Sequence, residues 1–462
     1  MLRSFLIFAA TLFLVAAPAS AQLAADPTSP PLDAAFCGGA LPPASNPIWN
    51  GELPAWGGTS RPLVKVTLTG DAICNDGSPA VIYIRPAPAT GPGGAPNPLR
   101  DMYHIHLKGG GSCRSFAECR ARFCATGPKF TDKPGLMSSL GYADQIEGTG
   151  LFADRPANRF ARANQVLAAY CSSDTWIGST LPGTAESIDP DDTDPADISG
   201  IAFMGEAIVA EMLDTLDAGA VASFGAPPVT YTMPPLADAA TILLSGDSAG
   251  ANGARHHIDR LAARYPDARV IGALDAGGGV DMQDPRIDFS VMANTPTYQD
   301  FMDLRTKQAR LFHGVEGSAL DASCLVSGSE TDCFDGYILG RDHVTTDLLQ
   351  RQSLGDTTTV AGLSPLVAGL GVPPAQSVRE ISFDGLLAAS AANPTLSVLG
   401  ANCPRHVTFR NNNQVANMRT MAGGTVLYRE LDWWVFSCRA GPVCPKLAVL
   451  APPLLPGSSI CP

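Results

Sequence analysis

The stretch that most constrains the fold lies in the middle of the chain, where an apolar run leads into a glycine-flanked serine. Residues 239–244 predict a buried strand, because this apolar run is too short for a typical helix. The motif Gly246-x-Ser248-x-Gly250 follows, and then a segment in which apolar residues recur at helical spacing. Strand, G-x-S-x-G and helix together predict a nucleophile elbow, a sharp turn that raises the serine oxygen above a sheet. The alternative is a glycine-rich turn without chemistry.

The N-terminus has the features of an export signal. Arg3 supplies a positive charge, residues 5–17 form an apolar run, and Ala19-Ser20-Ala21 is an A-x-A cleavage site. We therefore interpret residues 1–21 as a signal peptide and expect a secreted or periplasmic protein. All twelve cysteines lie after this segment, and in an oxidising compartment an even number favours disulfides over metal ligands. The sequence does not determine their pairing, and with no Cys-x-x-Cys pair no metal site is expected.

Charge and hydropathy disfavour several classes of partner. The formal net charge is −13, and an acidic surface disfavours nucleic acids and anionic membranes. After the signal peptide, no segment is long and apolar enough to predict a membrane span. Six acidic residues lie within 186–197, where a calcium-binding loop is conceivable. Their spacing fits no EF-hand pattern, so a solvated acidic loop is favoured.

The order of the other segments predicts how the chain is organised. Residues 22–58 are rich in Pro, Ala and Gly, which indicates an extended lead-in, and residues 59–462 are expected to form the catalytic domain. Apolar or alternating runs predict strands in this domain, and helical periodicity predicts a helix over 201–216. The expected strands are 64–68, 80–84, 103–107, 166–171, 270–274 and 348–354.

A glycine triplet, Gly109-Gly110-Gly111, follows the predicted strand at 103–107. Upstream of a G-x-S-x-G motif, this is where α/β-hydrolases turn backbone N–H groups toward the carbonyl under attack. Taken alone, the triplet is more typical of a flexible turn. Together with the elbow, it favours an oxyanion-hole loop.

A serine hydroxyl needs a base to accept its proton, and the base needs a third group to orient it. In α/β-hydrolases the acid follows the serine and the histidine comes last. The late position of His406, in a loop flanked by Cys and Pro, favours it as the base over His313 and His343. Asp356 lies at a predicted strand end and is the preferred acid. On the residues alone Asp275 and Asp384 remain alternatives.

Several short motifs together resemble the pectin acetylesterase/Notum family of secreted carboxylesterases. They occur in family order over roughly residues 60–440 and are more specific than G-x-S-x-G alone. They are His106-Leu107-Lys108-Gly109-Gly110-Gly111-Ser112-Cys113 with Cys119, residues 158–166 leading to Tyr170-Cys171-Ser172-Ser173-Asp174, the elbow, Leu274-Asp275-Ala276-Gly277, Gly355-Asp356, and Cys403-Pro404-Arg405-His406. The resemblance implies an α/β-hydrolase fold, with a mostly parallel sheet, helices on both faces and disulfide-stapled insertions.

The resemblance also implies roles for individual residues. Ser248 would be the nucleophile, Asp356 the acid and His406 the base, and the family counterpart of Asp275 is not the triad acid. The residues whose backbone would form the oxyanion hole are Gly110, Gly111 and Ala249.

The chain departs from the family pattern beside these residues. Asp247 and Ala251 stand where Cys- and Gly-like residues are common, and Gly111 and Ser112 stand where an aromatic residue is usual. The second departure leaves one wall of the acyl pocket undefined, so no acyl-chain preference is inferred.

We therefore expect a secreted serine carboxylesterase that removes O-acetyl groups from a polysaccharide such as pectin, without a metal or organic cofactor. A net acidic protein is repelled by polygalacturonate, so a neutral acetylated glycan or another small ester remains an alternative substrate. A lipase-like or protein-deacylating esterase and a catalytically silent glycan-binding protein also remain open. Trp176, Trp433 and Trp434 could line a glycan groove, although a position in the core is the favoured interpretation.

Overall fold

A computed structural model describes most of the chain. The described residues are 32–33, 36–39, 41, 49–58, 60–126, 133–182, 200–278, 280–327, 329–418 and 426–451. The predicted signal peptide at 1–21 and the acidic stretch at 186–197 lie outside these ranges. Within them, no helix combines the length and hydropathy that a bilayer crossing requires.

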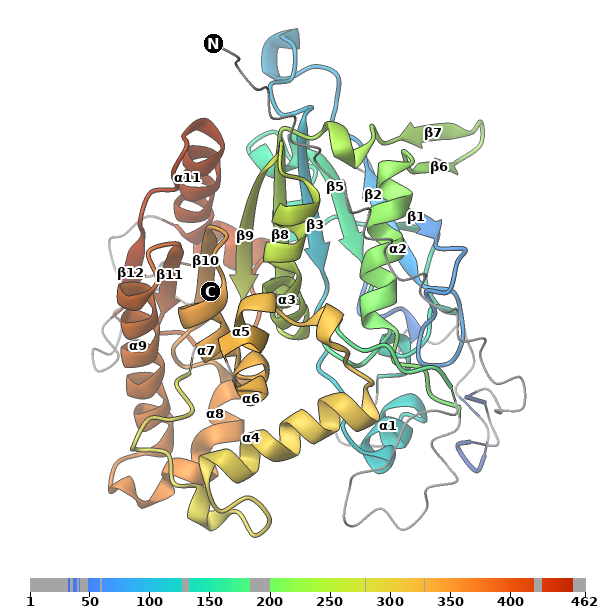
Figure 1. Ribbon diagram of the computed structural model, residues 1–462. Helices are drawn as coiled ribbons and strands as arrows, with labels where there is room; N and C mark the ends of the chain where they lie inside the picture. The colour runs from blue at the N-terminus through green and yellow to red at the C-terminus, as the bar shows by residue number, and fades with distance from the viewer. Residues whose placement is uncertain are drawn as a thin grey trace, which may run out of the picture.

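In the described part of the chain, the core is a ten-stranded sheet with the strand order β12-β11-β10-β9-β8-β3-β5-β2-β1-β4 (Figure 1). Neighbouring strands from β12 to β5 pair in parallel, whereas β2, β1 and β4 add an antiparallel edge. The strands are β1 (Leu63–Thr67), β2 (Val81–Arg85), β3 (Met102–Leu107), β4 (Gln145–Ile146), β5 (Asn164–Ala168), β8 (Thr241–Asp247), β9 (Arg269–Asp275), β10 (Leu348–Ser353), β11 (Leu396–Ala401) and β12 (Ala448–Leu450). A separate hairpin is formed by β6 (Val221–Phe224) and β7 (Val229–Thr232).

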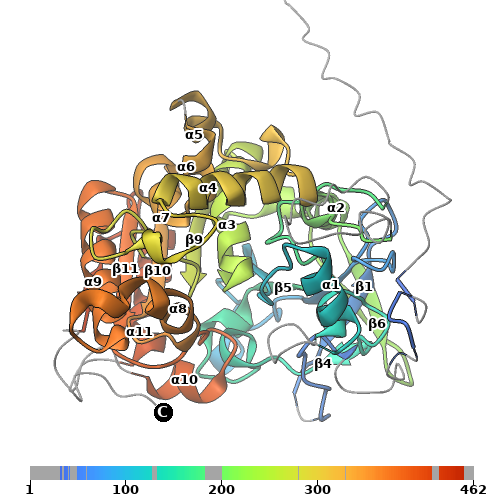
Figure 2. The ribbon, with the colours of Figure 1, turned by 90° about the horizontal axis from the view of Figure 1, so that it is seen from below.

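Helices cover both faces of this sheet. The α-helices in the described ranges are α1 (Phe116–Phe123), α2 (Gly205–Asp217), α3 (Ala249–Arg264), α4 (Tyr298–Lys307), α5 (Ala322–Ser327), α6 (Glu330–Phe334), α7 (Gly336–Ile338), α8 (Thr357–Leu363), α9 (Pro374–Ala392), α10 (Asn412–Asn417) and α11 (Leu427–Ala440). Helices α2, α3 and α9 pack on one face and α11 on the other, and the two views of the ribbon agree on this (Figures 1 and 2). This is the α/β-hydrolase fold that the sequence predicts.

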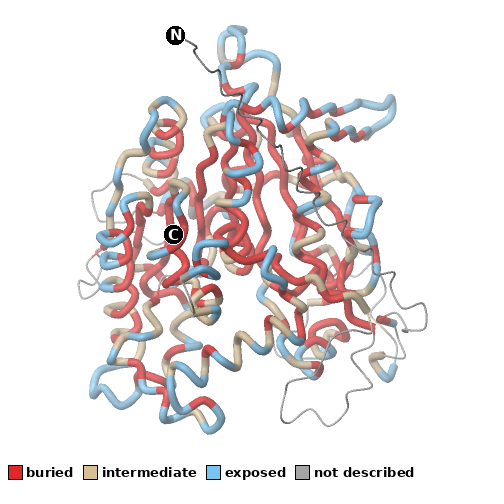
Figure 3. Tube along the Cα trace, in the orientation of Figure 1, coloured by how far each residue is buried: buried red, intermediate tan, exposed pale blue. Residues whose placement is uncertain are grey.

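The central strands are buried on both sides, as expected for parallel strands between two layers of helices (Figure 3). Because successive side chains of a strand point to opposite faces, β8 supplies two separate cores. Ile242 and Leu244 pack with α2 and α3, whereas Leu243 packs with α11. The parallel strands run downward in Figure 1, so their C-terminal ends lie on the side of α4 and α8. Open parallel sheets bind ligands outside these carboxyl ends.

Disulfides hold the connecting segments to this body, as the sequence predicts. Five of them join described residues: Cys37–Cys124, Cys74–Cys171, Cys113–Cys119, Cys324–Cys333 and Cys438–Cys444. The first connects the N-terminal lead-in to α1, and the third follows the glycine triplet. The domain boundary near residue 59 stays a prediction.

We predict that the long-range disulfide Cys74–Cys171 stabilises the fold more than the short-range disulfide Cys438–Cys444 does. Its cysteines are buried and 97 residues apart, whereas Cys438 and Cys444 are six residues apart. A cross-link that closes a longer loop removes more conformational entropy from the unfolded chain. Replacing both members of Cys74–Cys171 with serine should lower the free energy of unfolding by about 2–5 kcal/mol, measured by denaturant titration without reductant. The same change at Cys438–Cys444 should cost about 2 kcal/mol less, and an equal or larger cost there would contradict the prediction.

Candidate active site

The backbone at Ser248 forms the sharp turn that the sequence predicts between a strand and a helix. Ser248 lies between β8 and α3, with φ 54° and ψ −119°, a positive φ that is uncommon outside glycine. Its N–H donates to the backbone oxygen of Asp275 at the end of β9, at 2.8 Å. The side chain is only partly buried, so the turn presents the serine oxygen at the carboxyl edge of the sheet.

The flanking glycines are required because other backbone comes too close for a side chain. A Cβ at Gly246 would lie 2.1 Å from the backbone oxygen of Gly250. A Cβ at Gly250 would lie 1.9 Å from the backbone oxygen of Leu107, at the end of β3. The G-x-S-x-G spacing therefore lets α3 start directly against its own strand and the neighbouring one.

Two further loops bring a histidine and a carboxylate to Ser248. His406 follows β11, and its Nε2 lies 2.7 Å from the Ser248 Oγ. Its Nδ1 lies 2.7 Å from Oδ2 of Asp356, a fully buried residue that follows β10. The three residues thus form one continuous chain of hydrogen bonds.

Asp356 is fixed by groups other than the histidine. As the N-cap of α8, it accepts hydrogen bonds from the N–H groups of Thr358 at 2.8 Å and Thr359 at 3.2 Å. Its Oδ2 also accepts from Nε2 of Gln352 at 3.0 Å. These hydrogen bonds orient the carboxylate independently of His406.

The charge of Asp356 determines how readily His406 takes a proton. Burial by itself lowers the pKa of His406, but the hydrogen bond and the charge of Asp356 outweigh it and raise the pKa above the usual 6.5. The imidazole is therefore a stronger base than an isolated histidine. A carboxylate that acts in this way also fixes the tautomer, with the proton on Nδ1 and Nε2 free to accept from serine.

The glycine triplet begins against the serine turn, since a Cβ at Gly109 would lie 2.1 Å from the backbone oxygen of Asp247 and 2.9 Å from the Cβ of Ser248. Gly110 and Gly111 follow β3, and Gly111 has φ 71°. The oxygen of Gly110 accepts a hydrogen bond from Nη2 of buried Arg122 at 2.6 Å. Because the carbonyl of Gly110 and the N–H of Gly111 point in opposite directions across one trans peptide, this N–H points away from Arg122. Among the described residues, no acceptor pairs with the backbone N–H of Gly110, Gly111 or Ala249, the first residue of α3. These donors are therefore free to bind a developing oxyanion.

Comparison with known proteins identifies the family. The family model described as Pectinacetylesterase matches residues 59–363, well over half of the chain. The chain belongs to the pectinacetylesterase family. This confirms the resemblance inferred from the motifs, and with it membership of a family of carboxylic ester hydrolases.

Curated relatives are similar to part of the chain. The palmitoleoyl-protein carboxylesterase NOTUM of Mus musculus is 27% identical over 280 residues, which are 58% of this chain and 45% of that protein. Its Homo sapiens counterpart is 26% identical over 282 residues, 58% and 46% of the two chains. The chain thus spans less than half the length of these relatives. The solved structure of the Wnt deacylase Notum from Drosophila superposes with a TM-score of 0.58 at 22% identity, covering 84% of this chain and 97% of that one, which supports the fold.

Asp275 and Asp384, the alternatives to Asp356 as the acid, form ion pairs with arginines. Asp275 is buried and pairs with Arg351 at 2.8 Å, and it also accepts from the N–H groups of Thr408 and Phe409 in the loop that carries His406. Asp384 lies exposed on α9 and pairs with Arg286. Neither carboxylate has a hydrogen bond to His406. Sequence reasoning found the position of Asp275 but not its function as an anchor for this loop.

The alternative histidines also lie away from the serine. His313 Nε2 donates to the backbone oxygen of Cys113 at 2.7 Å, and His343 lies beside Ser323. The described residues contain no group of three or more His, Cys, Asp or Glu side chains that could hold a metal ion.

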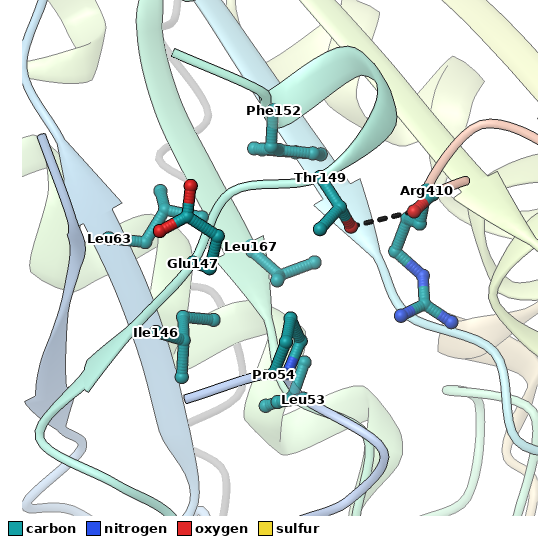
Figure 4. Close-up of a pocket in the computed structure, with 9 residues that line it drawn as sticks. All are labelled: Leu53, Pro54, Leu63, Ile146, Glu147, Thr149, Phe152, Leu167 and Arg410. Atoms are coloured by element: carbon teal, nitrogen blue, oxygen red, sulfur yellow. Dashed lines mark hydrogen bonds between the residues drawn. The ribbon is translucent and has the colours of Figure 1, made fainter. Parts of the chain in front are cut away.

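Two of the three tryptophans belong to the core. Trp176 and Trp434 are fully buried, whereas Trp433 is 51% exposed on α11. A small pocket lies beside Arg410 (Figure 4). Its apolar lining includes Leu53, Leu63, Ile146, Phe152 and Leu167. None of the Ser248, His406 and Asp356 side chains lines this pocket, so it is separate from the serine site.

We predict that Asp356→Asn lowers kcat/KM on an aryl acetate by about 10⁴-fold, because an amide at this position favours the wrong histidine tautomer. Asparagine is also a good N-cap, so α8 should remain and the variant should fold. Asp384→Asn is the matched control, since it removes an exposed carboxylate paired with an arginine and should leave the rate unchanged. A loss of less than tenfold in Asp356→Asn would contradict the prediction.

The pH profile should report the raised pKa of His406. Only the neutral imidazole accepts the serine proton, so kcat/KM on a neutral ester should rise with pH through an apparent pKa above 6.5. In Asp356→Asn the same limb should move to lower pH, because the charge that raises the pKa is gone. An unmoved limb in the variant would show that another group controls the profile.

Proposed function

We propose that the protein is a serine carboxylesterase that works through an acyl-enzyme. The observation that carries the proposal is the hydrogen-bonded series Ser248, His406 and Asp356 at the carboxyl edge of the sheet. His406 accepts the Ser248 proton as Oγ attacks the ester carbonyl, and then gives it to the leaving alcohol. Water deacylates the enzyme with His406 again as the base. Asp356 stabilises the imidazolium in both steps.

The oxyanion of each tetrahedral intermediate would bind the N–H groups of Gly110, Gly111 and Ala249. These donors have no acceptor among the described residues. Ala249 follows Ser248 directly, and Gly110 and Gly111 follow Gly109, which packs against the serine turn. Such preorganised donors act more strongly on the transition state than on the ester, which is what raises kcat.

The proposed substrate is an O-acetyl group on a polysaccharide such as pectin. The description of the matched family supports this choice. The packing behind the glycine loop is compatible with it, since a Cβ at Gly110 would lie 2.6 Å from the Tyr170 ring and 3.0 Å from Leu136. The space on that side of the loop is already filled, so a long acyl chain would have to leave in another direction.

Deacylation of a lipid-modified protein is the second candidate function. It is favoured by the curated relatives, which are named palmitoleoyl-protein carboxylesterases. We also propose secretion or export to the periplasm, which the disulfides between described residues support because such bonds persist in oxidising compartments.

We predict that the purified protein releases acetate from acetylated pectin or xylan and hydrolyses aryl acetate faster than butyrate or octanoate. Ser248→Ala should abolish all of these activities while leaving the fold intact, because it removes only the nucleophilic oxygen. Preference for octanoate would assign the protein to lipid or acyl-protein hydrolysis. Absence of serine-dependent turnover on every ester would overturn the esterase proposal and favour a glycan-binding protein.

A further inference from the structure

A buried carboxylate next to the nucleophile contacts the glycine loop and the histidine loop together. Asp247 is the last residue of β8 and is almost inaccessible. Its Oδ1 accepts hydrogen bonds from the N–H of Gly109 at 2.8 Å and from Nε2 of His106 at 2.9 Å. Its Oδ2 accepts from Nε and Nη2 of Arg410 at 3.1 and 2.9 Å. Each carboxylate oxygen of Asp247 thus accepts two hydrogen bonds.

His106, which donates to Oδ1 of Asp247, is a neutral side chain on β3. Burial lowers the pKa of His106, although the hydrogen bond to Asp247 acts against this effect. The ring donates from Nε2 to Asp247, and its Nδ1 accepts from the Ser245 hydroxyl at 2.8 Å. Ser245 in turn accepts from Nε2 of His104 at 2.8 Å. Strands β3 and β8 are therefore joined by side chains up to the point where the glycine loop begins.

The Arg410 side connects to the loop that carries His406, four residues earlier in the chain. The backbone of Arg410 is held in place, because its oxygen accepts from the Thr149 hydroxyl at 2.6 Å (Figure 4). The Arg410 side chain then reaches the Asp247 carboxylate and pairs with it. Burial alone would raise the pKa of Asp247, but the charge of Arg410 and the hydrogen bonds hold it well below its usual range.

From these contacts we infer that Asp247 is a positioning residue, which holds the N–H groups of the glycine loop at the correct distance from the Ser248 oxygen. The inference rests on the proposed esterase function. Asp247 precedes the nucleophile, its Oδ1 fixes Gly109 next to the oxyanion donors, and its Oδ2 fixes the histidine loop through Arg410. A carboxylate suits this position because all four donors point at it, whereas an amide would direct its own N–H groups at one pair of them.

The inference predicts a specific kinetic defect. The oxyanion contacts strengthen in the transition state, so a displaced glycine loop should lower kcat and leave KM nearly unchanged. Removal of one oxyanion donor costs about 10²–10³-fold in kcat, and a donor that is only displaced should cost about 10–100-fold. A residue with a purely structural role would reduce the amount of folded enzyme but not the turnover of each active molecule.

A pair of double variants separates the hydrogen bond from the charge. Asp247→Leu with Arg410→Met replaces the ion pair with apolar side chains of similar size, a change that buried ion pairs often tolerate, and leaves Gly109 without its acceptor. Asp247→Asn with Arg410→Met removes the same charges, but the amide oxygen can still accept from Gly109 and His106. The two variants therefore differ in the hydrogen bonds from Gly109 and from His106 and share the loss of Arg410.

The measurements are kcat and KM on an aryl acetate, with active sites counted by a serine-reactive phosphonate, and the affinity for an aryl trifluoromethyl ketone. We expect the leucine-containing variant to lose about 10–100-fold in kcat per site relative to the asparagine-containing one, and a similar factor in ketone affinity, because the ketone adduct uses the same donors. Equal kcat and equal ketone affinity in the two variants would overturn the inference. If the leucine variant does not fold, Asp247→Ser with Arg410→Met makes the same test, since the serine hydroxyl is too short to replace the carboxylate.

Failure of the inference is distinguishable from failure of the proposed function. If the wild type shows no turnover that depends on Ser248, the esterase proposal fails and the inference fails with it. If the wild type is active and the two double variants behave alike, only the role of Asp247 is wrong.

Discussion

The unusual backbone conformation of Ser248 is the constraint on which the rest of the site depends. A residue with a side chain adopts a positive φ at an energetic cost of about 1–3 kcal/mol, so surrounding contacts must hold it there. Strand β9 supplies one of these contacts through the oxygen of Asp275, and β3 supplies another where Leu107 meets Gly250. The turn therefore needs both neighbouring strands in register. A parallel sheet in which β8 pairs with β3 on one side and β9 on the other provides them.

Local patterns were sufficient to predict the parts of the structure that depend on nearby residues. The elbow, the glycine loop and the strands before Asp275 and Asp356 all follow from glycine positions and short apolar runs. Boundaries were less accurate where pairing decides them. The strand predicted to end at Leu244 continues to Asp247, because its residues pair with β3 as far as Gly246 and with β9 as far as Asp275.

The acid could not be identified from local pattern, because Asp275 and Asp356 have similar sequence environments and Asp384 also lies between Ser248 and His406 in the chain. Asp275 and Asp356 both lie at the ends of apolar strands, and they differ in their partners. Asp275 accepts from backbone N–H groups after His406, whereas Asp356 contacts the His406 ring. His406 is 50 residues from Asp356 and 158 residues from Ser248, so their meeting depends on the whole strand order. The partners of Asp247 were missed for the same reason, since Arg410 and Gly109 reach it from opposite directions along the chain.

Three buried carboxylates, Asp356, Asp275 and Asp247, raise the pKa of His406, and their pairing explains why Asp356 has the largest effect. Asp247 pairs with Arg410 and Asp275 with Arg351, so the positive charge of each arginine offsets part of the effect of its carboxylate on His406. Within the part of the chain that the structure describes, Asp356 has no arginine or lysine partner, and its other donors are two backbone N–H groups and an amide. Its full charge therefore acts on His406. An arginine paired with Asp356 would offset that charge and weaken the base, whereas the same pairing at Asp247 and Asp275 lets those carboxylates fix loops without competing for the histidine proton.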